Sequence, residues 1–431
     1  MRDLVTAIII FSSFPFTLKH TYIGVLVWSW IGYMNPHRLG WGFARDFPFA
    51  YLVAIVTLVS FLFNKEKKTF PKYGIVYVWF MFLGWMGLTT ITAISTDISL
   101  IQLEKVAKIQ LFIVLTMLMF ADLERLTKLI WVIALSLCYF GVKGGLFTIS
   151  HGGSFIVWGP PGTFIEGNNE LALAILMVIP FMNYLRFINQ NKWIKQGLIV
   201  AMVLMAASSL GSQSRGALLA ASAMLLLFWW KSKSKIITGI FAVILAITLI
   251  SFMPDTWHNR MGTIETYQED TSAMGRINAW IASYNLAKDR FMGAGFNGIL
   301  IGPVFHQYAP ENSKKLVAHS IYFQVLGDHG FVGLFLFLLL GFLTWTTGSK
   351  TIKRTRGIKE LENLNMLARM TQVSLLAYAT GGAFLSLPYF DLYYHLVVIT
   401  ILCRYLADQH KAKSLSQENM KKRQLYINNP S

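Results

Sequence analysis

The stretch HSIYFQVLGDHGFVGLFLFLLLGFLTWTT, residues 319–347, decides the fold of this chain. Most of it is apolar, and it is longer than the ~20 residues with which an α-helix crosses a ~30 Å hydrocarbon core. We expect one membrane-spanning helix to begin at His319. Comparable apolar stretches recur along the chain, and we expect further spans at 46–63, 74–93, 105–120, 126–148, 168–187, 193–211, 214–230, 236–253, 365–385 and 389–406.

The composition supports an all-α, polytopic integral membrane helix bundle. Of the 431 residues, 55% are hydrophobic and 14% are charged, whereas soluble globular proteins carry about 25% charged residues. Cys138 and Cys403 both lie in apolar stretches, so a disulfide framework is not expected.

The net charge of +17 orients the bundle and does not indicate a nucleic-acid partner. Lys and Arg gather in short connectors, such as 64–68, 122–128 and 348–359, and in the C-terminal tail. Such residues concentrate on the cytoplasmic side of membrane proteins. We therefore expect membrane lipids as partners, the connectors in the cytoplasm and both termini cytoplasmic.

The order of the spans predicts the domain organisation. If residues 3–34 cross once net, the total is about 12 transmembrane helices, whereas a break at Pro15 or at 19–21 gives about 13 spans or a re-entrant piece. The expected parts are N-terminal helices at 1–253, a large extracytoplasmic loop at 254–318, C-terminal helices at 319–406 and a basic tail at 407–431.

The expected loop at 254–318 has equal numbers of basic and acidic residues, so it is not a basic tail. Within it, Ile277, Trp280, Ile281 and Tyr284 recur at helical spacing. This stripe predicts a helix lying on, or docked against, the membrane surface.

Four residues near the expected outer face could carry chemistry. A neutral His319 imidazole can accept a proton near neutral pH, although an interfacial histidine held by a neighbour fits this stretch equally well. Arg215, in the turn before a span, either extends to water or binds phosphate, whose oxygens match a guanidinium bidentately. Arg276 shares a helix face with Trp280, which would draw it toward the bundle, while Arg290 follows Asp289 and could pair with it.

Other polar residues give weaker signals. Residues 293–298, GAGFNG, match the G-x-G-x-x-G pattern, but no strand-turn-helix unit surrounds them, so we interpret them as a turn. The histidines lack the paired spacing of a zinc site. We therefore expect no metal and no cofactor. Four acidic residues near outer span ends could orient sugars, namely Asp97, Glu166, Glu170 and Asp391.

His319 and Ser320, nine further residues, then Gly330 and Gly333 resemble the signature of bacterial O-antigen ligases. That signature is His, then Asn, Ser or Gln, nine residues, Gly, two residues, and Gly, Tyr or Thr. The long loop before the motif and the many spans are also similar to this family. We further expect Gly330 and Gly333 to let another helix approach closely.

The resemblance implies a GT-C-like bundle in the bacterial inner membrane, with a long helical periplasmic loop and a periplasmic active site. It implies a role in lipopolysaccharide biosynthesis, with an undecaprenyl-diphosphate-linked O-antigen donor and a lipid A–core acceptor. The family's essential histidine corresponds to His319, and its arginines to Arg215 and Arg276, with Arg290 as a further candidate. The implied reaction is a metal-independent, inverting glycosyl transfer.

Three other functions remain as alternatives. Protein O-oligosaccharyltransferases and O-antigen polymerases use the same kind of donor, so the acceptor is the open point. A lipid-linked glycan transporter or flippase would place ionisable groups near the bilayer midplane and often contains inverted repeats. Here the candidate groups gather at one face and no repeat is visible, which disfavours transport.

Overall fold

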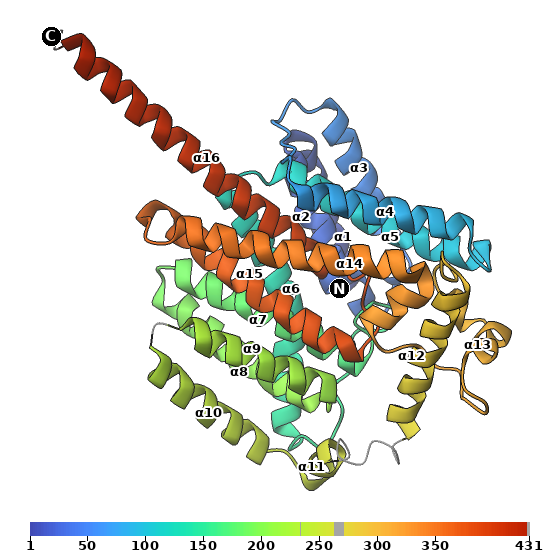
Figure 1. The fold of residues 1–431 in the computed structure, drawn as a ribbon. Helices are drawn as coiled ribbons and strands as arrows, with labels where there is room; N and C mark the ends of the chain where they lie inside the picture. The colour runs from blue at the N-terminus through green and yellow to red at the C-terminus, as the bar shows by residue number, and fades with distance from the viewer. Residues whose placement is uncertain (233, 263–270, 429–431) are drawn as a thin grey trace.

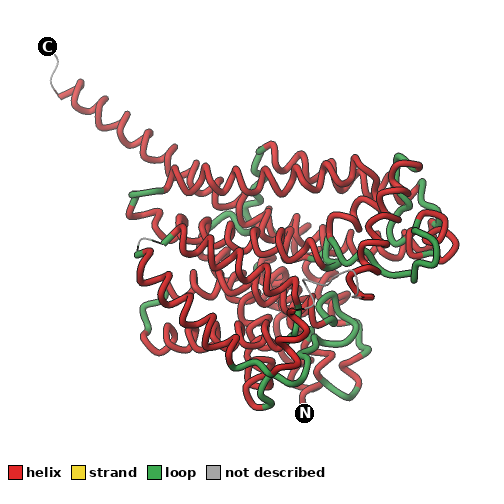
Figure 2. Tube along the Cα trace, turned by 60° about the horizontal axis from the view of Figure 1, so that its bottom comes forward, coloured by secondary structure: helices red, strands yellow, loops and turns green. Residues whose placement is uncertain are grey.

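The computed structural model describes residues 1–232, 234–262 and 271–428. Every regular element in these ranges is a helix (Figures 1 and 2). The α-helices are α1 (Arg2–Lys19), α2 (Thr21–Met34), α3 (Phe49–Phe63), α4 (Gly74–Ile91), α5 (Thr96–Met119), α6 (Leu123–Ser150), α7 (Asn168–Ile188), α8 (Lys192–Gly211), α9 (Arg215–Lys231), α10 (Lys235–Ser251), α11 (Asp255–Gly262), α12 (Thr271–Asp289), α13 (Gly302–Tyr308), α14 (Ile321–Thr355), α15 (Glu362–Gly381) and α16 (Asp391–Asn428). The short 3-10 helices are η1 (Pro36–Leu39), η2 (Phe43–Arg45), η3 (Gly298–Leu300), η4 (Lys359–Leu361) and η5 (Gly382–Phe384).

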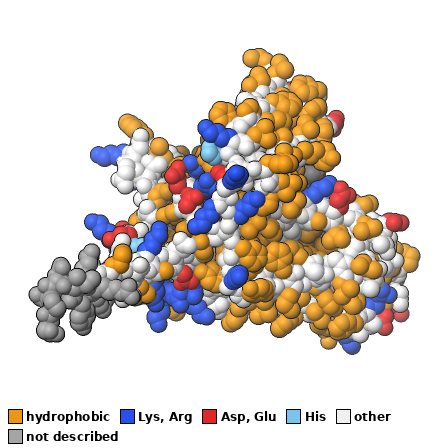
Figure 3. Space-filling model, turned by 90° about the horizontal axis from the view of Figure 1, so that it is seen from above, with side chains coloured by type: hydrophobic (Ala, Val, Ile, Leu, Met, Phe, Trp, Pro, Cys, Tyr) orange, Lys and Arg blue, Asp and Glu red, His pale blue; other side chains and the backbone are white. Residues whose placement is uncertain are grey.

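A helix lies at every apolar range that the sequence predicts. Five of the described helices, α4, α6, α7, α8 and α14, are long and apolar enough to cross a membrane, and α3 and α10 are shorter apolar helices. Hydrophobic side chains cover much of the face shown in Figure 3, and most Lys and Arg side chains on it lie toward the end where the C-terminal helix leaves. These features confirm an all-α membrane helix bundle, because in lipid a helix satisfies its own backbone groups.

The N-terminal helices α1 and α2 form an antiparallel pair, which differs from the single net crossing expected for 3–34. The chain turns at His20, where the backbone is extended. At one end, Asp3 accepts hydrogen bonds from the N–H groups of Gly42 and Ala44, at 3.1 and 3.2 Å. At the other end, Ser60 donates to the carbonyl of Thr17 at 2.6 Å. Residues 1–3 therefore lie at the end opposite to the connector at 64–68.

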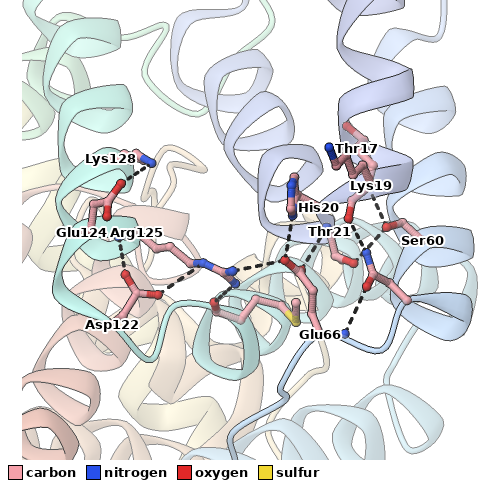
Figure 4. A network of polar contacts seen from close by, with 12 residues as sticks. Thr17, Lys19, His20, Thr21, Ser60, Glu66, Asp122, Glu124, Arg125 and Lys128 are labelled. Atoms are coloured by element: carbon pink, nitrogen blue, oxygen red, sulfur yellow. Dashed lines mark hydrogen bonds and ion pairs between the residues drawn. The ribbon is translucent and has the colours of Figure 1, made fainter.

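A polar network at the connector end ties this N-terminal unit to the bundle (Figure 4). Glu66 accepts a hydrogen bond from the Thr21 N–H at 3.2 Å and pairs with Arg125 at 3.1 Å and with His20 at 3.2 Å. We call the end that carries residues 64–68 and 122–128 the connector end. The end that carries residues 151–167 and 291–320 is called the loop end.

The C-terminal part returns to the connector end. Asp408 accepts hydrogen bonds from Tyr73 at 2.9 Å and from Arg404 at 2.8 Å, and it pairs with Arg354 at 2.6 Å. Since Tyr73 directly precedes α4 and follows the connector, Asp408 lies beside the connector and Asp3 lies at the opposite end. Residues 1–3 and Asp408 therefore lie at opposite ends of the bundle, whereas the single crossing expected for 3–34 would put both termini at one end.

Helix α14 bends at Gly330, where the backbone is non-helical, with φ 67° and ψ −171°. This region of the backbone map is essentially restricted to glycine. A Cβ on Gly330 would lie 2.2 Å from the carbonyl oxygen of Phe291, and a Cβ on Gly333 would lie 2.3 Å from the Cβ of His329. Gly330 thus permits the bend and the approach of a loop, which differs from the expected approach of a helix, whereas a Cβ on Gly333 would also lie 3.4 Å from Trp85 of the neighbouring α4.

The bend exposes three carbonyl groups that a straight helix would satisfy, and other segments supply their hydrogen bonds. Ala294 N–H donates to the carbonyl of Gly327 and Gly295 N–H to that of Asp328, both at 2.9 Å. The Trp85 indole donates to the carbonyl of His329 at 2.9 Å. The expected turn at 293–298 therefore satisfies the carbonyls freed by the broken helix.

The bend yields a test of stability. Gly330→Ala should destabilise the protein by about 1–3 kcal/mol, because alanine is strained at this φ and ψ, and the clash with Phe291 adds to that cost. The melting temperature of the purified protein in detergent measures the effect. The matched control is Gly341→Ala in the same helix, whose Cβ would meet its nearest neighbour at an ordinary 3.6 Å. Equal melting temperatures for the two variants would contradict this role of Gly330.

Candidate functional site

Helix α12 packs along the first part of α14 at the loop end (Figure 1). The Trp280 ring stacks on Phe323, with centroids 5.0 Å apart and planes 5° apart, and its indole donates to the carbonyl of Ala318 at 2.6 Å. Tyr284 meets Phe331 edge to face at 6.1 Å. Trp280 therefore docks α12 against the bundle, and Tyr284 contacts it at the edge.

The buried face of α12 differs in part from that stripe. Small and apolar side chains form it, namely Ala279, Ala282, Leu286 and Ala287. Ile281 and Tyr284 remain 39% and 46% exposed. The small side chains let α12 lie close to the loop that follows it, which is why the larger residues stay at the edge of the contact.

His319 lies just before α14, which begins at Ile321 and not at His319 as expected. Its backbone is left-handed, with φ 44°, a conformation that is uncommon outside glycine. The side chain is half-buried, and none of the described residues hydrogen-bonds its buried Nδ1 atom. Burial lowers the pKa of His319 below its ordinary value of 6.5, and the charge of Arg276 lowers this pKa further. A neutral imidazole at pH 7 follows from both effects.

Arg276 connects His319 with a carboxylate of another helix. Its guanidinium lies close enough to act electrostatically on His319 and on Glu170. Glu170 lies in the first turn of α7. A Cβ added to Gly167 would lie only 2.0 Å from the Oε2 atom of Glu170. The tertiary structure thus brings together Arg276, His319 and Glu170, which lie far apart in the sequence.

Arg215 is the first residue of α9, and Ser214 caps that helix by accepting a hydrogen bond from the Ala217 N–H at 3.2 Å. The turn before it is fixed from two sides. Asn168 donates to the carbonyl of Ser212 at 2.8 Å, and Gln213 has a left-handed φ of 54°.

The turn at η5 links the start of α9 with the start of α14. A Cβ on Gly216 would lie 3.0 Å from Phe384, and a Cβ on Gly382 would lie 2.5 Å from Ile321. The residues that precede α9 and α14 therefore flank the same turn, and Arg215 and His319 lie at the same end of the bundle.

Arg290 has a different environment from the other two arginines. Its guanidinium donates to the carbonyl of Gly293 through Nε and to that of Thr92 through one terminal nitrogen, both at 3.2 Å. These bonds fasten the end of α12 to the turn after α4. The guanidinium keeps one terminal nitrogen for a further contact.

The sequence did not distinguish Glu170 from the other acidic residues as a neighbour of Arg276. It was one of four acidic residues at outer span ends, and nothing in its local pattern distinguished it from the others. Glu166 instead organises its own loop by accepting from the Gly162 N–H at 2.7 Å, and Asp391 accepts from the Leu392 N–H at 3.0 Å. In the described ranges, no group of three or more His, Cys, Asp or Glu is placed to hold a metal ion.

The arrangement suits an anionic ligand and an acid–base step. The helices α7, α9 and α14 all begin at the loop end, and the N-terminus of a helix favours negative charge. Arg215 and Arg276 add full positive charges there, and guanidinium groups bind phosphate oxygens in pairs. A neutral His319, on which the charge of Arg276 acts, can accept a proton.

Two known family models match parts of the chain. Residues 200–338 match the family model described as O-Antigen ligase, and this range includes Arg215, Arg276, Arg290 and His319. Residues 1–191 match a second model, described as a family of unknown function (DUF5935). No curated protein matches the chain. Residues 200–338, which carry the motif that begins at His319, thus match the O-antigen ligase family.

Proposed function

We propose that the protein is a glycosyltransferase that joins a glycan carried on undecaprenyl diphosphate to lipid A–core at the periplasmic face of the inner membrane. The observation that carries the proposal is the placement of Arg276 beside His319, within the domain that matches the O-antigen ligase family. That pairing provides a cation for the donor's diphosphate and a base for the acceptor.

The reaction needs no energy source beyond the donor. The oxygen of an acceptor hydroxyl attacks the anomeric carbon, the bond from that carbon to the diphosphate breaks, and the hydroxyl proton passes to His319. Negative charge grows on the leaving diphosphate, where Arg215 and Arg276 stabilise it. A single direct displacement inverts the anomeric centre. Arg290, with two nitrogens bonded to carbonyls, makes at most a secondary contact.

The proposed orientation follows from charge and from the position of the site. The basic connectors place the connector end in the cytoplasm, so the loop end faces the periplasm and residues 254–318 form most of the periplasmic segment. Residues 263–270 of that segment lie outside the described residues. With α1 and α2 as two helices, the proposed count is about 13 spans, with the N-terminus periplasmic and the C-terminus cytoplasmic.

The identity of the acceptor distinguishes this function from the alternative functions. Purified protein would receive the lipid-linked donor together with lipid A–core, with a pilin-like protein, or alone. Glycan transfer to lipid A–core supports the proposal, transfer to the pilin-like protein supports an O-oligosaccharyltransferase, and chain growth with donor alone supports a polymerase. Movement of the donor across vesicles without transfer would indicate a flippase.

Replacing His319 tests whether this residue is the general base that takes the proton of the acceptor hydroxyl. His319→Ala should lower transfer by about 10²–10⁴-fold, since a positioned general base contributes about that much, while its melting temperature stays near that of the parent protein. His306→Ala is the matched control, because His306 is exposed on α13 in the same segment. Initial rates with purified protein measure both, and full activity of His319→Ala would remove this residue from the mechanism.

Replacing the arginines tests the diphosphate contacts. Arg215→Ala and Arg276→Ala should each lower transfer by about 10²–10³-fold, as does loss of a contact to developing charge. Lys288→Ala on exposed α12 surface is the control for loss of one positive charge. Rates at low donor concentration measure the effect. If an arginine variant transfers glycan at the same rate as Lys288→Ala, the arginine that it replaces does not contact the diphosphate.

The pH dependence of transfer tests the coupling between Arg276 and His319. Since the pKa of His319 is lowered, its neutral form is present above that lowered value, and transfer should fall as the pH drops through it. Arg276→Gln removes the nearby positive charge, so the pKa should rise and the acid limb should move to higher pH. Arg276→Lys keeps the charge and should leave the limb in place. If the transfer rates of Arg276→Gln and Arg276→Lys fall over the same acidic pH range, the charge of Arg276 does not act on the pKa of His319.

A further inference from the structure

A second site lies at the other end of the bundle. A cavity of about 1650 Å³ extends between α7, α8, α9, α10 and α15. Its loop-end wall includes Leu210 and Leu249, and its connector-end wall includes the loop between α14 and α15. The volume exceeds the ~300–1,000 Å³ typical of small-molecule pockets. A ligand that fills this space must be long.

The connector end of the cavity is strongly cationic. Five basic residues line it, namely Arg186, Lys231, Arg356, Lys359 and Arg369. Glu362 is the single acidic residue that we find in the described lining. Among the described ion pairs, none joins any of these five cations to a carboxylate. The cluster therefore carries an excess of positive charge beside an apolar space.

The cations are held in place although they repel each other. Arg356 acts electrostatically against Arg369, and Arg369 acts against Lys231. Arg369 donates to the carbonyl of Lys231, and Lys231 donates to the side chain of Gln372. Gln372 in turn donates to the carbonyl of Trp345 at 2.8 Å.

The loop that carries Arg356 is also fixed. Asn365 donates to the carbonyl of Ile352 at 2.9 Å and to the hydroxyl of Thr355 at 2.8 Å. The positive-inside rule accounts for basic residues at this end. It does not account for the half-buried Lys231 and Arg369, which are fastened at the cavity beside the exposed Arg356 and Lys359 and repel each other until an anion relieves that repulsion.

The rest of the cavity suits hydrocarbon. From the connector end toward the loop end, its walls are formed by side chains such as Phe228, Leu225, Ala221, Leu245 and Leu249. Helix α10 forms the outer wall and lies at the edge of the bundle (Figure 1). None of the described side chains of α10 is fully buried. The cavity therefore borders the lipid on this side.

We propose that this cavity binds an anionic phospholipid of the membrane leaflet at the connector end. Its phosphate would contact Arg356, Lys359 and Arg369, and its acyl chains would lie between α9 and α10. Charge complementarity carries the choice of ligand, since basic pockets between membrane helices on the cytoplasmic side recognise anionic headgroups. The site lies at the opposite end of the bundle from His319, so the proposal does not depend on the glycosyltransferase function.

The experiment compares lipid binding by two double variants of the full-length protein. Arg356→Gln with Lys359→Gln removes two exposed cations of the cavity, and Lys350→Gln with Lys353→Gln removes two exposed cations of α14 outside it. Native mass spectrometry of detergent-purified protein would measure bound phosphatidylglycerol and phosphatidylcholine of equal chain length. The cavity variant should bind phosphatidylglycerol roughly tenfold more weakly than the parent, and the control should bind it like the parent.

A third variant tests the apolar part without a change of charge. Ala221→Trp places a large ring in the cavity and should also weaken phosphatidylglycerol binding, while the melting temperature reports whether the bundle remains folded. Equal binding of the two phospholipids by the parent protein, or equal losses in the cavity variant and its control, would overturn the proposal. Recovery of a polyprenyl phosphate in place of the phospholipid would overturn it as well.

Discussion

The bend in α14 is the constraint on which the rest of the loop end depends. A helix broken beside lipid must have its freed carbonyls satisfied within the protein. Here the N–H groups of Ala294 and Gly295 and the Trp85 indole supply those bonds. The carboxylate of Asp328 accepts from the Asn297 N–H at 2.9 Å and from Tyr389 at 2.8 Å. These five hydrogen bonds together join α14 to the long loop, to α4 and to the segment before α16.

This junction explains how two distant residues keep a fixed relation. The chain leaves α12, forms the turn at 293–298 on the bend, and returns through α13 to His319. The stacking of Trp280 on Phe323 adds a second attachment between α12 and α14. Because the turn at 293–298 and the stacked Trp280 both hold α12 against α14, Arg276 stays near His319. A site built on fastened helices keeps its geometry better than one built on free loops.

The two ends of the bundle handle charge differently. At the loop end, Arg276 acts electrostatically on Glu170 and His319, where helix N-termini favour an anion. At the connector end, Glu66 and Asp408 each pair with nearby cations, whereas the cavity between α9 and α15 keeps basic residues without described carboxylate partners. Positive charge at both ends suits a protein that would handle a lipid diphosphate on one side and contact anionic lipid on the other.

The sequence alone determined the class of fold and the approximate positions of the long apolar helices, because hydropathy and length are local properties of the chain. It also drew attention to His319 through a short motif, and one glycine of that motif, Gly330, permits a bend. Only the tertiary structure decided that α1 and α2 form a hairpin, that 293–298 covers the bend, and that Glu170 lies near Arg276. These contacts join segments far apart in the sequence, and their geometry depends on how the helices pack, which no local pattern records.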